Sequence, residues 1–472
     1  MKGARPLGVT LVCGFLLAGC WGLPTNPPPV TGVQASATVT TVSLSWSNPS
    51  SNFWGVRVYR AVGSTAPPGP GFGQGPGNYL ADVGDRMSFT DTRVSAGTTY
   101  SYSVITYGAD GYYSVPVAVT ITVQESATAI VGGGLHSCAG LAGGSVACWG
   151  SNIYGQLGNG TTTGSATAVA VSGLGNAIAV TVGYDHSCAL LPSGGIECWG
   201  RGNDGQLGNG TTVNSSIPVP VSGISSAVGV SAGDRHTCAL LADGTIRCWG
   251  YNVYGQLGNG TTTSSSTPVP VSGLTGAVAL DAAVFDSCAL LTGGTARCWG
   301  RNWFGQLGDG TNNNSTTPVN VVGVSGATAI STGPHTCVLT SGTVQCWGAN
   351  LFGQLGNGST VDSSVPVNVT GISTATAVSV GDGHTCAVLT GGTLQCWGHN
   401  FSGQLGNGTT ANSWVPTTVT ALSGVTAVSA AANHSCALAS DGHAHCWGYN
   451  SSGQLGNGTT TNSPTPVPVS GL

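Results

Sequence analysis

The sequence has 472 residues, of which only 6% are charged, and its formal net charge is −5. Lys2 is the only lysine, and residues 125–472 contain just five arginines. Nucleic-acid binding depends on basic side chains that neutralise phosphates, so this composition excludes a nucleic-acid partner. The 78 glycines favour tight turns and strand packing over helices.

Residues 1–19 have the pattern of a signal peptide. Lys2 and Arg5 precede the apolar stretch LGVTLVCGFLLAG, which is too short to span a bilayer. The stretch ends in Leu17-Ala18-Gly19-Cys20, which resembles a bacterial lipobox. That resemblance implies cleavage before Cys20, lipidation of its thiol and a membrane anchor in the bacterial cell envelope, periplasmic or at the cell surface. An ordinary signal peptide with an incidental Cys20 is the alternative.

Residues 20–31 include LPTNPPPV and are predicted to form a stiff spacer after the lipidated cysteine. Residues 32–124 then contain alternating runs such as VSLSWSNP, WGVRVYRA and TTYSYSVITYG, at the spacing of a β-sandwich. Trp46 and the pair Tyr100 and Tyr102 resemble a fibronectin type III domain. The resemblance implies that Trp46 lies in the core and that Tyr100 or Tyr102 forms the tyrosine corner. We expect this domain to act as a spacer rather than as an adhesive unit.

Residues 125–472 contain one repeat seven times, and its clearest copy is GDRHTCALLADGTIRCWGYNVYGQLGNG at 233–260. The first cysteine of each copy recurs every 49 or 50 residues, at Cys138, Cys188, Cys238, Cys288, Cys337, Cys386 and Cys436. Each copy has four short runs rich in Val, Thr, Cys and Trp, bounded by turn residues, and none has an extended helical period. Four strands per copy in seven copies predict a seven-bladed β-propeller.

The central hairpin of each copy predicts a disulfide. In Cys188–Cys198 a three-residue loop centred on Ser193 places the cysteines opposite each other, and the pair Cys337–Cys346 keeps this register with a two-residue loop. Free cysteines and a zinc site are the alternatives, although zinc ligands usually have closer spacing. The predicted pairs are Cys138–Cys148, Cys188–Cys198, Cys238–Cys248, Cys288–Cys298, Cys337–Cys346, Cys386–Cys396 and Cys436–Cys446. Such pairing is typical of an exported protein.

The elements HTCALL, CWGxNxxGQLGNG and PVPV closely resemble the repeat of the regulator of chromosome condensation family, from Ser126 to Leu472. The resemblance implies an all-β, seven-bladed propeller after the fibronectin type III-like sandwich. The family's name-giving member is a nucleotide exchange factor for a nuclear GTPase, and a secreted bacterial beta-lactamase inhibitor is built from related repeats. The regular cysteine pairs depart from a nuclear protein, and the fold alone does not choose between these functions.

A histidine stands two residues before the first cysteine in six copies, at His136, His186, His236, His335, His384 and His434, whereas the fourth copy has Asp286. A ring of imidazoles suggests a metal site, but a repeated structural role is the interpretation we favour. His443 and His445 flank the last hairpin turn, and we expect exposed strand histidines rather than ligands. The sequence predicts no metal site and no cofactor.

The two positions before each GQLG vary between copies and include many aromatic residues. Because turns lie at blade rims, these residues either form an exposed partner-binding rim or pack against neighbouring blades. The candidate rim consists of Tyr154, Tyr254, Trp303, Phe304, Phe352, Phe401, Arg201 and Arg301.

No catalytic constellation is present: the carboxylates are scattered, and no glycine-rich loop opens a helix. We therefore expect a non-catalytic, lipid-anchored binding protein of the cell envelope with a protein or glycan partner. An inhibitor of a secreted or periplasmic enzyme is the alternative, and guanine nucleotide exchange is a remote one.

Overall fold

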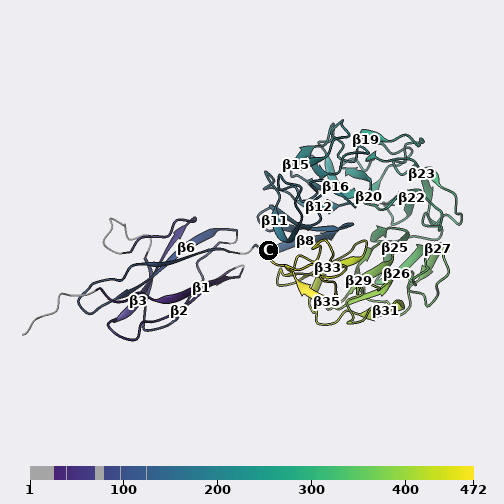
Figure 1. Ribbon diagram of the computed structural model, residues 1–472. Coiled ribbons are helices and arrows are strands. Elements are labelled where there is room, and N and C mark those ends of the chain that lie inside the picture. The colour runs from purple at the N-terminus through teal and green to yellow at the C-terminus, as the bar shows by residue number, and fades with distance from the viewer. Residues whose placement is uncertain (1–25, 39, 70–78, 96, 124) are drawn as a thin grey trace, which may run out of the picture. The chain divides into compact units, whose positions relative to one another are not determined.

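The computed structural model describes residues 26–38, 40–69, 79–95, 97–123 and 125–472. All of its regular elements are β-strands, as the sequence predicts (Figure 1). The chain divides between Gln124 and Glu125 into two compact units. No helix in the described part is long and apolar enough to cross a membrane. The predicted signal peptide, residues 1–19, and the predicted lipidation site, Cys20, lie outside the described residues.

The first unit is a sandwich of two antiparallel sheets with orders β1-β2-β5 and β4-β3-β6-β7. This is the arrangement expected of a fibronectin type III domain. Its strands are β1 (Thr31–Ala37), β2 (Val42–Ser47), β3 (Gly55–Val62), β4 (Tyr79–Gly84), β5 (Ser88–Asp91), β6 (Thr99–Tyr107) and β7 (Val117–Thr122).

Trp46 lies in the sandwich core, as the resemblance implies. Tyr100 forms the corner, because its hydroxyl accepts a hydrogen bond from the backbone N–H of Ser95 at 3.1 Å. Tyr102 has a different role: its buried hydroxyl donates to Asp91 Oδ2 at 2.9 Å. Burial and this contact with the Asp91 carboxylate raise the pKa of Tyr102 above the ordinary tyrosine value.

The described part of the proline-rich segment belongs to the sandwich rather than to a free spacer. Val30 is 1% exposed and packs in the core. The Pro28 carbonyl accepts a hydrogen bond from Thr106 Oγ1 at 2.6 Å, and β1 begins at Thr31. The sandwich therefore begins before residue 32, because the apolar residue that follows the prolines is needed to fill the core.

The second unit has seven four-stranded antiparallel sheets, and in each the strands follow one another in chain order. Blade 1 has β8 (Ala127–Gly132), β9 (His136–Leu141), β10 (Val146–Gly150) and β11 (Ser165–Ala170). Blade 2 has β12 (Ala179–Val182), β13 (His186–Leu190), β14 (Ile196–Gly200) and β15 (Ser215–Pro220). Blade 3 has β16 (Ala227–Ala232), β17 (His236–Leu241), β18 (Ile246–Gly250) and β19 (Ser265–Pro270). Blade 4 has β20 (Ala277–Ala282), β21 (Asp286–Leu291), β22 (Ala296–Gly300) and β23 (Ser315–Asn320).

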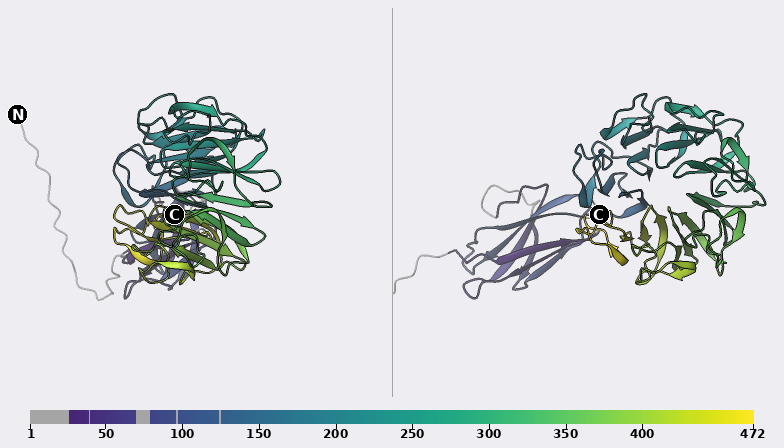
Figure 2. Two further views of the ribbon diagram at one scale, coloured as in Figure 1. Left: turned by 90° about the vertical axis from the view of Figure 1, so that its right-hand side faces the viewer. Right: turned by 45° about the vertical axis from the view of Figure 1, so that its right-hand side comes forward.

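Blade 5 has β24 (Ala329–Thr332), β25 (His335–Thr340), β26 (Thr343–Gly348) and β27 (Ser363–Asn368). Blade 6 has β28 (Ala375–Val380), β29 (His384–Leu389), β30 (Leu394–Gly398) and β31 (Ser413–Thr418). Blade 7 has β32 (Val425–Ala430), β33 (His434–Ala439), β34 (Ala444–Gly448) and β35 (Ser463–Pro468). The first strand of every blade lines the central cavity. The sheets are arranged in a ring (Figure 2).

The cysteines of each central hairpin are directly opposite each other, as in the pair Cys188 and Cys198. The shorter fifth hairpin keeps Cys337 opposite Cys346. The structure contains seven disulfides with the pairing that the hairpin register predicts, and each lies within one blade.

The hydrophobic core of the propeller lies between blades. In the core of blades 2 and 3, for example, Leu190 and Leu207 of blade 2 pack with Trp249 of blade 3. Trp249 and its equivalents in the other six blades are all fully buried. Burial of seven tryptophans at equivalent positions makes each blade depend on its neighbour.

The ring closes between complete blades, a point that the sequence leaves open. Blade 7 packs against blade 1 through β33 and β8, which are also adjacent in Figure 1. The Trp149 indole N–H donates to the Gln454 carbonyl at 2.9 Å, and Ser137 Oγ donates to the same oxygen at 3.1 Å. These are the bonds that every other pair of neighbouring blades makes, so no strand is exchanged between the first and last blades.

Candidate functional site

The functional candidates lie at one end of the propeller, which we call the loop face. It comprises the connections between the first and second strands of each blade and those between the third and fourth strands, such as 133–135 and 151–164. Both connections leave the same end of a blade, because His136 at the start of β9 pairs with Gly150 at the end of β10. A hydrogen bond from the backbone N–H of Ser151 to the Leu135 carbonyl at 2.9 Å joins them.

The repeated GQLGNG segment holds neighbouring blades together. The Gln206 carbonyl accepts hydrogen bonds from Trp249 Nε1 at 2.9 Å and from Thr237 Oγ1 at 3.0 Å, both in the next blade. Gly208 has a φ of 69°, and a Cβ there would lie 2.6 Å from Trp249 Nε1. The constant residues of the loop therefore serve the fold, and only its variable residues are free to bind a partner.

The variable pairs before GQLG differ in exposure. The first residue of each pair is exposed in all seven blades, and Trp303 is 53% exposed. The second residue is half-buried in six blades, including Tyr154, Tyr254 and Phe352, whereas Phe304 is 38% exposed. The rim is thus partly exposed to solvent and partly packed. The exposed partner-binding rim and the packing against neighbouring blades, the two alternatives that the sequence leaves open, each describe some of these residues.

One group of rim residues forms an aromatic cluster on blades 3 and 4. The Tyr254 ring lies 5.4 Å from the Trp303 ring and 5.2 Å from the Phe285 ring, measured between centroids. Tyr251 lies 5.8 Å from Phe285. The Arg301 guanidinium lies over Phe285 at 5.0 Å and over Trp303 at 5.4 Å, within the range of a cation–π interaction.

A second aromatic cluster lies on blades 5 and 6. The ring of His399 lies 4.4 Å from that of Phe352 and 4.7 Å from that of Phe401. Leu351 and Phe401 are 73% and 68% exposed. We call the two clusters, together with the exposed Phe304 and Leu351, the aromatic crescent; it consists of Tyr251, Tyr254, Phe285, Trp303, Phe304, Leu351, Phe352, His399 and Phe401.

Tyr154 and Arg201 lie apart from the crescent, on blades 1 and 2. The Arg201 guanidinium lies 5.3 Å from the centre of the Tyr154 ring and pairs with Asp185 at 3.4 Å. Arg235 likewise pairs with Asp204, at 2.7 Å. The structure therefore divides the predicted rim residues between the aromatic crescent and the separate pair Tyr154 and Arg201. Arg201 does not present a free charge to a partner, because its guanidinium is paired with Asp185.

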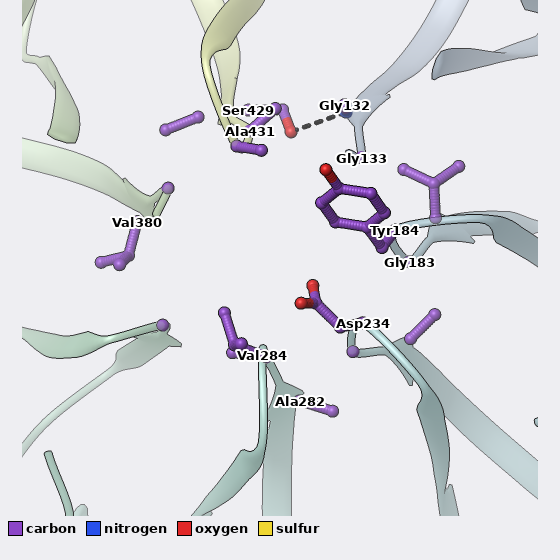
Figure 3. Close-up of a pocket in the computed structure, with 18 of the residues that line it drawn as sticks. Gly132, Gly133, Gly183, Tyr184, Asp234, Ala282, Val284, Val380, Ser429 and Ala431 are labelled. Carbon is purple, nitrogen blue, oxygen red and sulfur yellow. Dashed lines mark hydrogen bonds between the residues drawn. The ribbon is translucent and has the colours of Figure 1, made fainter. Parts of the chain in front are cut away.

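A cavity of about 190 Å³ occupies the centre of the ring. Figure 3 shows Tyr184 and Asp234 pointing into it from blades 2 and 3. Asp382 of blade 6 also lines it. Neither the Asp234 nor the Asp382 carboxylate has a hydrogen-bond partner among the described residues. Burial and the charge of Asp382 raise the pKa of Asp234, and burial raises that of Asp382 to about 6; the nearby Arg301 opposes both shifts.

The six repeated histidines link blades rather than bind metal. In each of the six, Nε2 lies 2.6–2.8 Å from a Ser or Thr hydroxyl of the next blade. That hydroxyl donates its proton to the Gln carbonyl of the preceding blade, as Thr237 does to Gln206. The histidine must therefore donate Nε2–H. Its buried Nδ1 has no hydrogen-bond partner among the described residues that could accept a second proton, so the imidazole is neutral. Burial lowers the pKa of His236 to about 3, in agreement.

Asp286 replaces the histidine in blade 4 and reaches the next blade through Thr332. Asp286 Oδ2 lies 2.7 Å from Thr332 Oγ1, which lies 2.8 Å from Thr336 Oγ1. Thr332 donates a hydrogen bond to the Asp286 carboxylate, and Thr336 donates to the Gln306 carbonyl at 3.0 Å. Burial raises the pKa of Asp286 to about 7, although the Thr332 hydrogen bond and the charge of Arg301 oppose the shift.

No group of three or more His, Cys, Asp or Glu residues in the described part is arranged to hold a metal ion. His443 and His445 do not form such a group: His443 pairs with Asp441 at 3.2 Å, and His445 is half-buried.

Several residues of the loop face were missed by the sequence analysis: Tyr184, Asp234, Tyr251, Phe285, Asp382 and His399. They occupy the positions just before the repeated histidine or just after CWG. Like the rim pairs, these positions vary from copy to copy. Because the common fold does not constrain them, this variation is the signal that could have identified them.

A model of the RCC1-like domain matches residues 97–411, and a model of the regulator of chromosome condensation (RCC1) repeat matches 392–438 and 441–472. Yeast RCC1 (Prp20), in its complex with Kap60, is 20% identical, with 70% of this chain and 84% of that chain covered and a TM-score of 0.62. Human WBSCR16 is 22% identical, with 69% and 94% covered and a TM-score of 0.61. These structures share the fold. A search of curated proteins found no match.

Proposed function

Because the chain belongs to the family of RCC1-like domains, we propose that it is a non-catalytic binding protein whose loop face captures a protein partner. The aromatic crescent is the observation that carries this proposal. Exposed aromatic side chains that are already held by neighbouring rings lose little entropy on binding, and they are common energetic centres of interfaces.

We also propose that the protein lies outside the cytoplasm. Seven disulfides within blades suit an oxidising compartment outside the cytoplasm. The signal-like segment at 1–19 and the lipobox-like Cys20 support export followed by anchoring in the cell envelope. The crescent would then face partners in the periplasm or at the cell surface.

The test is quantitative capture of a partner by in-cell cross-linking followed by affinity purification. Trp303 and Phe304 are replaced together by alanine, and the matched control replaces Val228 and Val278. These valines are 58% and 60% exposed, near the opposite ends of inner strands β16 and β20.

We expect wild type and control to capture the same partner, and the Trp303/Phe304 variant to lose it with an unchanged melting temperature. A partner that both alanine variants capture equally would show that the crescent is not the binding site.

A further inference from the structure

The centre of the loop face carries charge that the protein itself leaves uncompensated. Asp234 and Asp382 reach the cavity from blades 3 and 6 and have no ion-pair partner among the described residues. By contrast, Asp185 and Asp204 are paired with Arg201 and Arg235. Burial raises the pKa of both carboxylates, and the charge of Asp382 raises that of Asp234 further. Ionising either group in this site is therefore costly, and a cation from outside would offset that cost.

Tyr184 adds a second element that suits a cation. Its ring is 37% exposed and points into the cavity (Figure 3). The face of a tyrosine ring carries negative potential and attracts ammonium and guanidinium groups. Arg301 is the cation of the protein nearest to these groups, but it is held over Phe285 and Trp303.

The size of the cavity limits what can enter. At about 190 Å³ it is smaller than the roughly 300–1,000 Å³ of typical small-molecule pockets. It therefore fits one long side chain better than a whole ligand. The aromatic crescent covers the loop face on blades 3 to 6, the same blades that supply Asp234 and Asp382. One partner segment can therefore contact both.

We propose that the loop face recognises a protein loop that inserts a lysine or arginine side chain between Asp234 and Asp382 while its apolar flanks pack on the aromatic crescent. This inference rests on the proposed function and names the chemistry of its partner. Charge complementarity of this kind gives an interface its specificity.

Binding of such a loop is linked to pH. A cation favours the ionised carboxylates, whose pKa values are raised in the free protein, to about 6 for Asp382. The affinity should therefore fall as the pH decreases through 6, because protons compete with the basic side chain. Arg301, Asp185 and Asp286 also act on Asp234, Tyr184 is acted on by both carboxylates, and Asp281 lines the same cavity.

The probe is a phage-displayed library of random peptide loops closed by a disulfide, selected on purified residues 26–472. We expect the selected loops to have a central Lys or Arg flanked by apolar residues. A selected loop is then synthesised, together with a version in which norleucine replaces the basic residue.

Binding is measured to wild type and to the double variant Asp234→Asn, Asp382→Asn. The control is Asp243→Asn, an exposed aspartate on the hairpin turn at the other end of blade 3. We expect the basic loop to lose about tenfold or more in affinity for the double variant, and none for the control. Wild type should also bind more weakly at about pH 5.5 than at about pH 7.5, whereas the double variant should not.

The outcomes separate the two proposals. Selected loops that need Trp303 and Phe304 but carry no basic residue would overturn this inference and leave the proposed function intact. So would basic loops that bind the double variant as tightly as wild type. A library that yields no loop dependent on Trp303 and Phe304 would overturn both.

Discussion

Asp286 Oδ2 lies 2.7 Å from Thr332 Oγ1 across the boundary between blades 4 and 5. At the other six boundaries a neutral imidazole donates to a hydroxyl. A carboxyl group thus takes the place of a histidine here. It accepts a hydrogen bond from Thr332, which fills the distance between the shorter side chain and Thr336.

The raised pKa of Asp286 predicts how its contribution to stability depends on pH. Its pKa is about 7 in the folded protein against an ordinary value of 3.8. The contribution is therefore fully present below about pH 4 and is lost as the pH rises to 7, at about 1.4 kcal/mol per unit and about 4 kcal/mol in total. Urea unfolding from about pH 5.5 to about pH 8 should show wild type losing stability relative to Asp286→Asn, whose amide does not titrate. Parallel curves would contradict the raised pKa of Asp286.

The six buried histidines predict the opposite dependence. Burial lowers their pKa values to about 3, or about 4 for His434, while unfolded histidine has a pKa near 6.5. Stability that is present above pH 6.5 should be lost as the pH falls toward 3, at about 1.4 kcal/mol per unit for each fully buried imidazole.

Nuclear magnetic resonance of the histidine rings checks this. The six imidazole signals should keep their neutral positions from pH 8 to about 5.5, a range over which the signal of a free imidazole makes most of its shift. A signal from any of the six that moves near pH 6.5 in the folded protein would show that its ring is not held as a buried donor.

The boundary between blades 7 and 1 should be the weakest in the ring. Ser137→Ala there and Ser187→Ala between blades 1 and 2 each remove a hydroxyl that contacts a histidine and donates to a Gln carbonyl. Each should cost about 1–3 kcal/mol. Only Ser137→Ala should accelerate amide exchange of β8 and β33 selectively, because no chain connection holds that boundary closed. Equal exchange profiles for the two variants would contradict this.

The disulfides should stabilise single blades. Replacing Cys238 and Cys248 by alanine removes one closed loop of blade 3, and we expect a loss of about 2–3 kcal/mol. The check is a guanidinium unfolding curve beside that of wild type with all seven disulfides intact. An unchanged midpoint would show that the hairpin is already held by its neighbours.

The sequence predicts most of the fold because the repeat encodes it. Cysteine spacing determines the hairpin register, including the shortened turn between Cys337 and Cys346. The mode of ring closure is not predictable in this way, since closed units and an exchanged strand use the same repeats. It depends on the Ser137 and Trp149 bonds to Gln454, which join residues about 300 positions apart.

The candidate site is only half predictable. The variable pairs identify Trp303 and Phe401. Phe285 comes from another loop and meets Tyr254 only through folding, and His399, in the same loop as Phe401, meets Phe352 of the preceding blade in the same way. Exposure of the pairs also depends on tertiary packing, because Tyr254 is partly covered by Phe285 of the next blade. Asp234 and Asp382, whose carboxylates line the central cavity, are 148 residues apart in sequence.

Because each blade contributes all four of its own strands, a boundary never requires a particular first or last unit. A gene that gains or loses one whole repeat preserves every pairing inside the remaining sheets, and the angle at each boundary then adjusts to the new number of blades. The number of copies can therefore change in a single genetic event, and with it the width of the central opening and the spacing of the side chains around it.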